Sequence, residues 1–388
     1  KKAVPLVQEA DASRSTEEEA ATRSSRDLDA ENGTAESITT IQLNAAGKPA
    51  SEGNFGNWYY SAASGCQLDT GVFALQPSSE PEAESALKAR LFRIGDNAEL
   101  VRGTVGCETI NYGTIFDGIF QGKVANFRTI SNGTFQGSVN NYQTISDGTF
   151  QGKVANFRTI SGGTFQGEVT NNGTISDGNF QEKVANFRTI SGGTFEEVVE
   201  MNESPDGAKI EGGTFKKGIE LNAYYPTITD GLFDGKVSAA EGYPVMLSIS
   251  GGLFTKAVDV SNINAGKLSI TGGYFASEPT MPNGSGISFT SVSEQDGRTF
   301  QVPVNGDFSE NSYTSLYVPS GSSEQPNIIT VKTDTALIDC RAADADVSIM
   351  SSVVSNGGNT YEIPVRGHGQ IVLETEEPAP PAPPTTGD

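Results

Sequence analysis

A short block of residues is repeated along the middle of the chain, and this repeat restricts the folds that the chain can adopt. Phenylalanine occurs at a fixed step of 15 residues from Phe120 to Phe195, and then at wider steps as far as Phe275. The ten phenylalanines are Phe120, Phe135, Phe150, Phe165, Phe180, Phe195, Phe215, Phe233, Phe254 and Phe275. Isoleucine stands five residues before each of them and glycine two residues before it, and nine of the ten are followed four residues later by an aliphatic residue. Fixed periods of this kind are typical of solenoids and other repeat arrays.

The residue types in the block favour strands over helices. Helical repeats need about 33–47 residues, whereas this block is short and rich in β-branched Ile, Thr and Val, which favour strands. Its Asp/Asn/Gly–Gly pair is a turn signal. One unit therefore forms one coil of about three short strands, and identical coils stack about 4.8 Å apart. We predict an all-β parallel β-helix, or β-solenoid, of about ten coils, in which the Ile, Phe and aliphatic positions form three inner columns.

Two further columns accompany the inner ones. Asparagine recurs at Asn111, Asn126, Asn141, Asn156, Asn171 and Asn186. Stacked asparagines can hydrogen-bond to the copies above and below, as in cross-β assemblies, so we predict a ladder. A column of aromatic residues follows the asparagines at Phe127, Tyr142, Phe157 and Phe187. The sequence leaves open whether this aromatic column faces inward or outward, and inward is the preferred interpretation.

Composition excludes several classes of function. The 388 residues include 26 basic and 48 acidic residues, which gives a formal net charge of −22. Such a charge argues against nucleic acid or an anionic membrane as a partner, because each phosphate contact needs a cation. With one His and three Cys, we expect no metal site and no cofactor. No apolar run is long enough to span a bilayer, so no transmembrane segment is expected.

The chain divides into five regions by composition. Residues 1–40 are acidic and poor in large apolar residues, so we expect them to be disordered. Residues 41–107 are predicted to form an N-terminal β cap, because a solenoid without caps exposes open sheet edges. Residues 108–285 form the solenoid, and residues 286–373 form a second β element that is either a small sandwich or irregular coils. Residues 374–388 are a Pro-rich spacer, which favours an extended conformation.

Two local features of the N-terminal region lead to expectations of their own. The spacing of Ala and Leu after Ser79 and Pro81 predicts a short helix over residues 81–93. Cys66 and Cys107 either pair or pack as small buried apolar residues, the latter being preferred, and Cys340 has no evident partner. No secretory signal is visible, so an exported chain would have lost it.

The Pro-rich segment contains a recognisable motif. Residues 383–387 read Pro-Pro-Thr-Thr-Gly, which resembles the sortase signal Leu-Pro-x-Thr-Gly at Pro384, Thr386 and Gly387, with Pro383 in place of Leu. The units ISGGTF and ITGGYF likewise resemble the parallel β-helix repeats of surface proteins of the Firmicutes. The resemblance implies that sortase joins Thr386 to peptidoglycan and that the protein is extracellular and attached to a Gram-positive cell wall. Such families include proteins presumed to be adhesins and, more distantly, β-helices that degrade polysaccharides.

Catalysis has weak support in the sequence. A glycosidase needs two carboxylates at a set spacing. Asp117, Asp147 and Asp177 lie on alternate coils, about 9.6 Å apart, at turn positions where Asp is common. His368 has no nucleophile motif beside it, and the pair Asp344 and Asp346 is too small for a calcium loop. We therefore expect no enzyme, with a polysaccharide lyase or glycoside hydrolase as an alternative.

Binding is the preferred functional interpretation. After Phe195 the coils lengthen at residues 202–207, 222–226, 239–244 and 262–266. Insertions in repeat proteins map to loops, often on the binding face, and these insertions carry Tyr224, Tyr225 and Tyr243, whose rings can stack on a sugar or a protein. We expect a cell-surface adhesin-like or structural display protein that binds a glycan or a host protein. A second alternative is ice binding by the stacked Thr-x-Ser units of residues 129–191.

Overall fold

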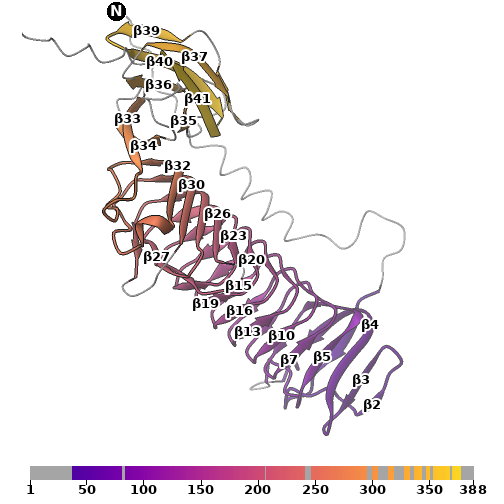
Figure 1. Ribbon diagram of the computed structural model, residues 1–388. Helices are drawn as coiled ribbons and strands as arrows, with labels where there is room; N and C mark the ends of the chain where they lie inside the picture. The colour runs from indigo at the N-terminus through magenta and orange to yellow at the C-terminus, as the bar shows by residue number, and fades with distance from the viewer. Residues whose placement is uncertain are drawn as a thin grey trace, which may run out of the picture.

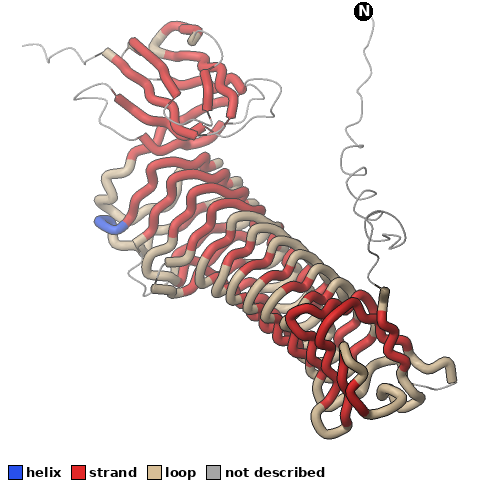
Figure 2. Tube along the Cα trace, turned by 90° about the vertical axis from the view of Figure 1, so that its right-hand side faces the viewer, coloured by secondary structure: helices blue, strands red, loops and turns tan. Residues whose placement is uncertain are grey.

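The computed structural model describes the chain as a rod of stacked coils with small antiparallel sheets at its C-terminal end (Figures 1 and 2). Among the residues that it describes, the regular elements are β-strands, apart from one 3-10 helix, η1 (Ala265–Lys267). The described residues are 37–80, 84–205, 207–240, 246–294, 299–304, 313–318, 327–332, 336–342, 347–349, 353–367 and 369–376. Parallel stacking of the coils confirms the predicted all-β fold with a β-solenoid of about ten coils.

Each 15-residue coil contributes three short strands that pair in parallel with their copies in the next coil. In one coil these are β10 (Val124–Asn126), β11 (Thr129–Ile130) and β12 (Thr134–Phe135). Their partners one coil later place Val124 opposite Val139, Ile130 opposite Ile145 and Phe135 opposite Phe150. The other strands of this regular stack are β7 (Thr109–Asn111), β8 (Thr114–Ile115), β9 (Ile119–Phe120), β13 (Val139–Asn141), β14 (Thr144–Ile145), β15 (Thr149–Phe150), β16 (Val154–Asn156), β17 (Thr159–Ile160), β18 (Thr164–Phe165), β19 (Val169–Asn171), β20 (Thr174–Ile175), β21 (Asn179–Phe180), β22 (Val184–Asn186), β23 (Thr189–Ile190) and β24 (Thr194–Phe195).

The interior of the rod consists of the three predicted apolar columns. The ten phenylalanines are fully buried, and successive rings stack with centroids 4.5–5.0 Å apart. Burial of each such side chain contributes about 1.5–3 kcal/mol. The glycine two residues before each ring lets the chain turn the corner: Gly163 has φ 108°, in the region that favours glycine. A repeated corner therefore keeps every ring in line with the next.

The predicted asparagine ladder runs inside the rod from Asn111 to Asn186, and all six side chains are fully buried. From Asn111 to Asn171, each Nδ2 donates to the Oδ1 of the asparagine in the next coil, over 2.7–2.8 Å. The same Nδ2 atoms also reach backbone carbonyls, as Asn141 does at Thr159 over 2.9 Å. The ladder ends where Met201 pairs with Asn186 and where Ile94 pairs with Asn111. Stacking thus satisfies buried amides that would otherwise be costly.

The N-terminal region joins the stack earlier than residue 108. Strand β4 (Gly65–Gln76) pairs in parallel with β5 (Phe92–Arg102), and β5 pairs in parallel with β7 and β8. Before them, β1 (Thr39–Gln42) pairs in parallel with β4, and β2 (Gly53–Asn54) and β3 (Trp58–Ser61) form antiparallel pairs. Strand β6 (Thr104–Val105) lies against β9.

The helix expected over residues 81–93 is wrong for the part that the structure describes. Residues 84–91 contain no helix, and Phe92 begins β5. Leu87 is fully buried and bonds to the stack instead: its N–H donates to the carbonyl of Thr104, and its carbonyl accepts from the N–H of Gly106. Pairing with the neighbouring coil outweighed the local preference for helix.

The coils after Phe195 carry longer strands. The sheets beyond them contain the antiparallel pairs β33–β34 and β36–β40 and the three-stranded order β35–β41–β37, with a second apolar cluster that includes Tyr274, Phe300 and Leu373. The bounds are β25 (Val199–Asn202), β26 (Lys209–Phe215), β27 (Gly218–Asn222), β28 (Thr227–Phe233), β29 (Lys236–Ala239), β30 (Leu247–Phe254), β31 (Val258–Asp259), β32 (Leu268–Phe275), β33 (Ser288–Glu294), β34 (Thr299–Val304), β35 (Tyr313–Val318), β36 (Asn327–Lys332), β37 (Leu337–Ala342), β38 (Val347–Ile349), β39 (Val354–Gly357), β40 (Thr360–Gly367) and β41 (Gly369–Thr375).

Candidate functional site

An outward-facing stack of aromatic side chains runs along the regular coils. We call Tyr112, Phe127, Tyr142 and Phe157 the outer aromatic column. Their exposed fractions are 42%, 39%, 39% and 46%. Successive ring centroids lie 5.1, 4.7 and 5.0 Å apart, with interplanar angles of 7–16°. The preferred inward interpretation of this column is therefore wrong.

Local backbone geometry explains why the column faces outward. In each coil the asparagine is the last residue of its strand and points inward, so the next residue lies at the corner on the opposite side. The corner is pinned by a backbone bond, as from the N–H of Phe157 to the carbonyl of Asn141 over 2.8 Å. Sequence reasoning missed Tyr112, although it follows Asn111 in the same way that Phe127 follows Asn126.

Stacking decides which part of each ring a ligand can reach. Inside the outer aromatic column, neighbouring rings cover one another's faces, so the ring edges point to solvent. Exposed apolar groups that continue over several coils mark interaction surfaces more often than single exposed residues do. The column is therefore suited to contact a partner along the rod.

Two of the three predicted loop tyrosines can be placed. Tyr224 and Tyr225 lie between β27 and β28 and are 38% and 56% exposed. Their ring centroids are 6.4 Å apart and the rings are tilted by 44°, so they do not form one flat platform. The N–H of Met246 donates to the carbonyl of Tyr224 over 2.7 Å and ties the loop to the following coil. Tyr243 lies outside the described residues.

The carboxylates considered for catalysis take part in turns. Oδ1 of Asp117, Asp147 and Asp177 accepts a hydrogen bond from the N–H of the following glycine over 2.7 Å. This bond stabilises the corner, which is the role expected of Asp in a turn. His368, Asp344 and Asp346 fall among the residues that the structure leaves undescribed. No group of three or more His, Cys, Asp or Glu in the described ranges is placed to hold a metal ion.

The hydroxyl groups of the Thr-x-Ser units are partly used within the rod. The hydroxyls of Ser161, Ser176 and Ser191 donate to isoleucine carbonyls of the preceding coil over 3.2–3.3 Å. Hydrogen atoms engaged in this way are not available to order water. This geometry weakens the case for an ice-binding face.

The three cysteines are free thiols, and Cys66 is buried. Burial raises the pKa of Cys66 to about 12 and that of Cys340 to about 12, and it also raises the pKa of Cys107. The thiolate is the reactive form of cysteine. At neutral pH these side chains therefore behave as small apolar groups, which agrees with the preferred interpretation.

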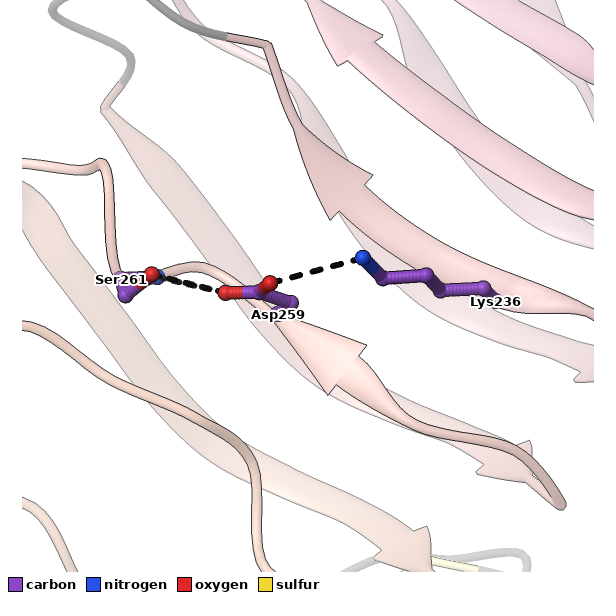
Figure 3. Close-up of polar contacts among 3 residues, drawn as sticks. All are labelled: Lys236, Asp259 and Ser261. Carbon is purple, nitrogen blue, oxygen red and sulfur yellow. Dashed lines mark hydrogen bonds and ion pairs between the residues drawn. The ribbon is translucent and has the colours of Figure 1, made fainter.

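Ion pairs between successive coils lie on the surface of the rod. Figure 3 shows one of them, in which Nζ of Lys236 on β29 lies 3.4 Å from Oδ2 of Asp259 on β31. Oδ1 of Asp259 also accepts from the hydroxyl of Ser261 over 2.8 Å. These contacts hold the pKa of Asp259 below its usual value, the Ser261 hydroxyl contributing most. Similar pairs join Lys153 to Glu168, Lys183 to Glu200, Lys216 to Glu196 and Lys217 to Glu197.

Comparisons with protein-family models, with curated proteins and with solved structures find no match for this chain. The sorting-like residues Pro384, Thr386 and Gly387 lie beyond the described part of the chain. Among the residues that are described, none belongs to a helix with the length and apolar character needed to cross a bilayer.

Proposed function

We propose that this chain is an extracellular adhesin-like or structural display protein that binds a glycan or a host protein through its solenoid. The observation that carries the proposal is the outer aromatic column, four exposed rings held in line by consecutive coils. Each coil is paired to its neighbours over three strands, so the column is rigid before a ligand arrives. Preorganisation of this kind lowers the entropic cost of binding.

The loop tyrosines supply a second candidate contact in the same proposal. Tyr224 and Tyr225 are exposed on a longer coil, and their tilted rings can contact a ligand from two directions. Tyr243 belongs to the next insertion along the sequence. Binding rather than catalysis is proposed because the carboxylates Asp117, Asp147 and Asp177 each cap a turn.

An array of glycans and host surface proteins tests the proposal. The wild type is compared with a loop variant (Tyr224→Ala, Tyr225→Ala, Tyr243→Ala) and a column variant (Phe127→Ser, Tyr142→Ser, Phe157→Ser). We expect at least one ligand of the wild type to be lost in one of the variants, while both keep the thermal unfolding transition of the rod. If the wild type binds nothing on the array, or if both variants bind everything that it binds, the proposal is wrong.

Attachment to a Gram-positive cell wall by sortase is proposed from the resemblance of residues 383–387. Sortase would break the amide between Thr386 and Gly387, release the Gly387 amine, and form a new amide between Thr386 and the amine of peptidoglycan. Incubation of the chain with sortase and triglycine should give a product in which triglycine replaces residues 387–388, detected by mass spectrometry. Thr386→Ala should abolish this product, and an unchanged mass for the wild type would rule the attachment out.

A further inference from the structure

The outward aromatic position is not occupied by a ring in every coil. Asn172 stands where the preceding coil has Phe157 and the following coil has Phe187. The backbone is not displaced there, because Asn171 pairs in register with Asn156 and with Asn186. The N–H of Asn172 donates to Asn156, and that of Phe187 to Asn171, over 2.7 and 2.8 Å. A ring is therefore missing from an otherwise regular position.

Between Phe157 and Phe187 the outward position carries the half-buried side chain of Asn172, which is smaller than a phenyl ring. Two coils span about 9.6 Å at the strand spacing of a sheet. A flat ring placed midway between Phe157 and Phe187 would lie about 4.8 Å from each, close to the 4.7–5.1 Å that separates the rings of the outer aromatic column. Phe157 is 46% exposed, against 39% for Phe127 and Tyr142, which have a ring on both sides. Asn172 therefore covers the face of Phe157 less than a ring would, whereas Phe187 on the far side is half-buried.

Polar groups surround this position. Asn172 contributes a half-buried side-chain amide, and the exposed Thr170 lies two residues earlier on the same coil, in register with Ala155 and Ala185. Arg158, which is also exposed, follows Phe157. The next residue after Asn172 is Gly173, so no side chain projects beside the gap at that point. A Cβ on Gly173 would lie 2.2 Å from the carbonyl oxygen of Arg158, which keeps the position small.

We propose that Phe157, Asn172 and Phe187, with Thr170 and Arg158 beside them, form a missing-ring site for one carboxylate-bearing pyranose of an acidic glycan. A pyranose has two faces of C–H groups, which suit aromatic rings above and below. Its hydroxyl groups radiate from the ring edge, where the Asn172 amide and the Thr170 hydroxyl can bond to them. Its carboxylate can pair with the guanidinium of the exposed Arg158, a group that favours planar anions.

An aromatic side chain of a partner protein fits the site less well. A phenyl ring would fill the same thickness, but it has no polar edge to pair with Asn172 and Thr170. Burial of those groups without partners would cost free energy. The acidic sugar is therefore the occupant that uses both the apolar faces and the polar surroundings. This inference rests on the proposed function as a glycan-binding surface protein. It adds to that proposal a class of ligand, acidic glycans, and a binding site that is separate from the loop tyrosines.

The substitution Asn172→Phe tests the site by filling it. A phenyl ring at position 172 completes the stack from Tyr112 to Phe187, so we expect the variant to unfold at the same temperature as the wild type or above it. Oligosaccharides that end in glucuronate, galacturonate or sialate are the probes, with neutral oligosaccharides of the same length beside them. We expect the affinity for an acidic probe to fall by about tenfold or more, which corresponds to about 1.4 kcal/mol. Asn140→Phe, the same change at an exposed position outside the gap, should leave binding unchanged.

Arg158→Gln removes the positive charge and leaves both rings in place, so it tests the contribution of charge to binding separately from that of stacking. It should weaken binding of the acidic probes and leave any binding of the neutral ones unchanged. If acidic probes bind Asn172→Phe as tightly as the wild type, the site is wrong, and loss of binding in the loop variant would then leave the proposed function standing. If the wild type binds no glycan and no protein, both proposals fail. If Asn172→Phe loses only a protein ligand, the assignment to an acidic sugar is overturned.

Discussion

Nδ2 of Asn141 lies 2.8 Å from Oδ1 of Asn156, and both side chains are fully buried. Nδ2 of Asn156 in turn donates to Oδ1 of Asn171 over 2.7 Å. Each inner amide of the ladder, from Asn126 to Asn171, is therefore both donor and acceptor to amides of neighbouring coils. A buried amide without such a partner would destabilise the rod, so the ladder ties the register of one coil to that of the next.

Removal of one member of the ladder should be costly. Asn156→Ala leaves an N–H of Asn141 without its acceptor and takes away a donor to Asn171, and each unsatisfied group costs about 1–3 kcal/mol. We expect a clear fall in the urea midpoint of unfolding. Asn172→Ala, the matched change outside the ladder, should stay within about 0.5 kcal/mol of the wild type. Equal midpoints for the two variants would mean that the ladder contributes no stability.

The inner and outer rings should respond differently to truncation. Phe165→Ala opens a cavity between Phe150 and Phe180, and losses of this kind cost about 3–5 kcal/mol. Phe157→Ala removes a ring that is nearly half exposed, so we expect a cost of about 1 kcal/mol or less. Chemical denaturation of both variants measures the difference. A larger loss for Phe157→Ala would contradict the outward placement of its column.

The contribution of Asp259 to stability should depend on pH. Its folded-state pKa lies below the usual value of 3.8, with the Ser261 hydroxyl as the leading cause and Lys236 adding to it. The carboxylate therefore stabilises the fold above pH 3.8, and this contribution is lost as the pH falls through the lowered pKa. Because the Lys236–Asp259 pair is exposed, its contribution to the free energy of unfolding is about 1 kcal/mol or less.

Asp259→Asn measures this contribution. We expect the variant to be slightly less stable than the wild type at pH 7, and the difference in unfolding midpoint to vanish in strong acid. Ser261→Ala should reproduce a large part of the effect, because the Ser261 hydroxyl is the main partner of Asp259. A difference that grows as the pH is lowered would reverse the sign of the pKa shift and refute the account.

Cys66 should resist alkylation in the native rod. Its side chain is buried and burial raises its pKa to about 12, so almost no thiolate forms at pH 8. Iodoacetamide followed by mass spectrometry should find Cys66 unmodified in buffer and modified in urea. Rapid labelling under native conditions would show that the coil containing Cys66 opens readily.

Repetition explains why much of the fold was predictable. Every coil meets a near copy of itself, so the residues that point inward in one coil, such as Ile160 and Phe165, also define the neighbours that they contact. The residue pattern of one coil therefore also predicts the register in which it pairs with the next coil. Where the copies differ, prediction is weaker: the residues around Leu87 favour a helix, and nothing near them in the sequence reveals the bonds of Leu87 to Thr104 and Gly106.

The candidate sites depended more on three-dimensional geometry. The tilt between Tyr224 and Tyr225 arises from a loop whose conformation no repeat specifies. The importance of Asn172 emerges only when Phe157 and Phe187 are seen as its neighbours across coils. Alternation alone did not settle the direction of Phe127, because the strand ends at Asn126 and the conformation of the corner that follows also decides it.

The sequence by itself determined the 15-residue period, the three apolar columns and the asparagine ladder, because these follow from one block that must bury the same residues in each copy. Only the tertiary structure decided which side of the rod the aromatic column takes and how early the stack begins. Those features depend on corner angles and on bonds between segments far apart in the chain, which the residue pattern of a single coil does not contain.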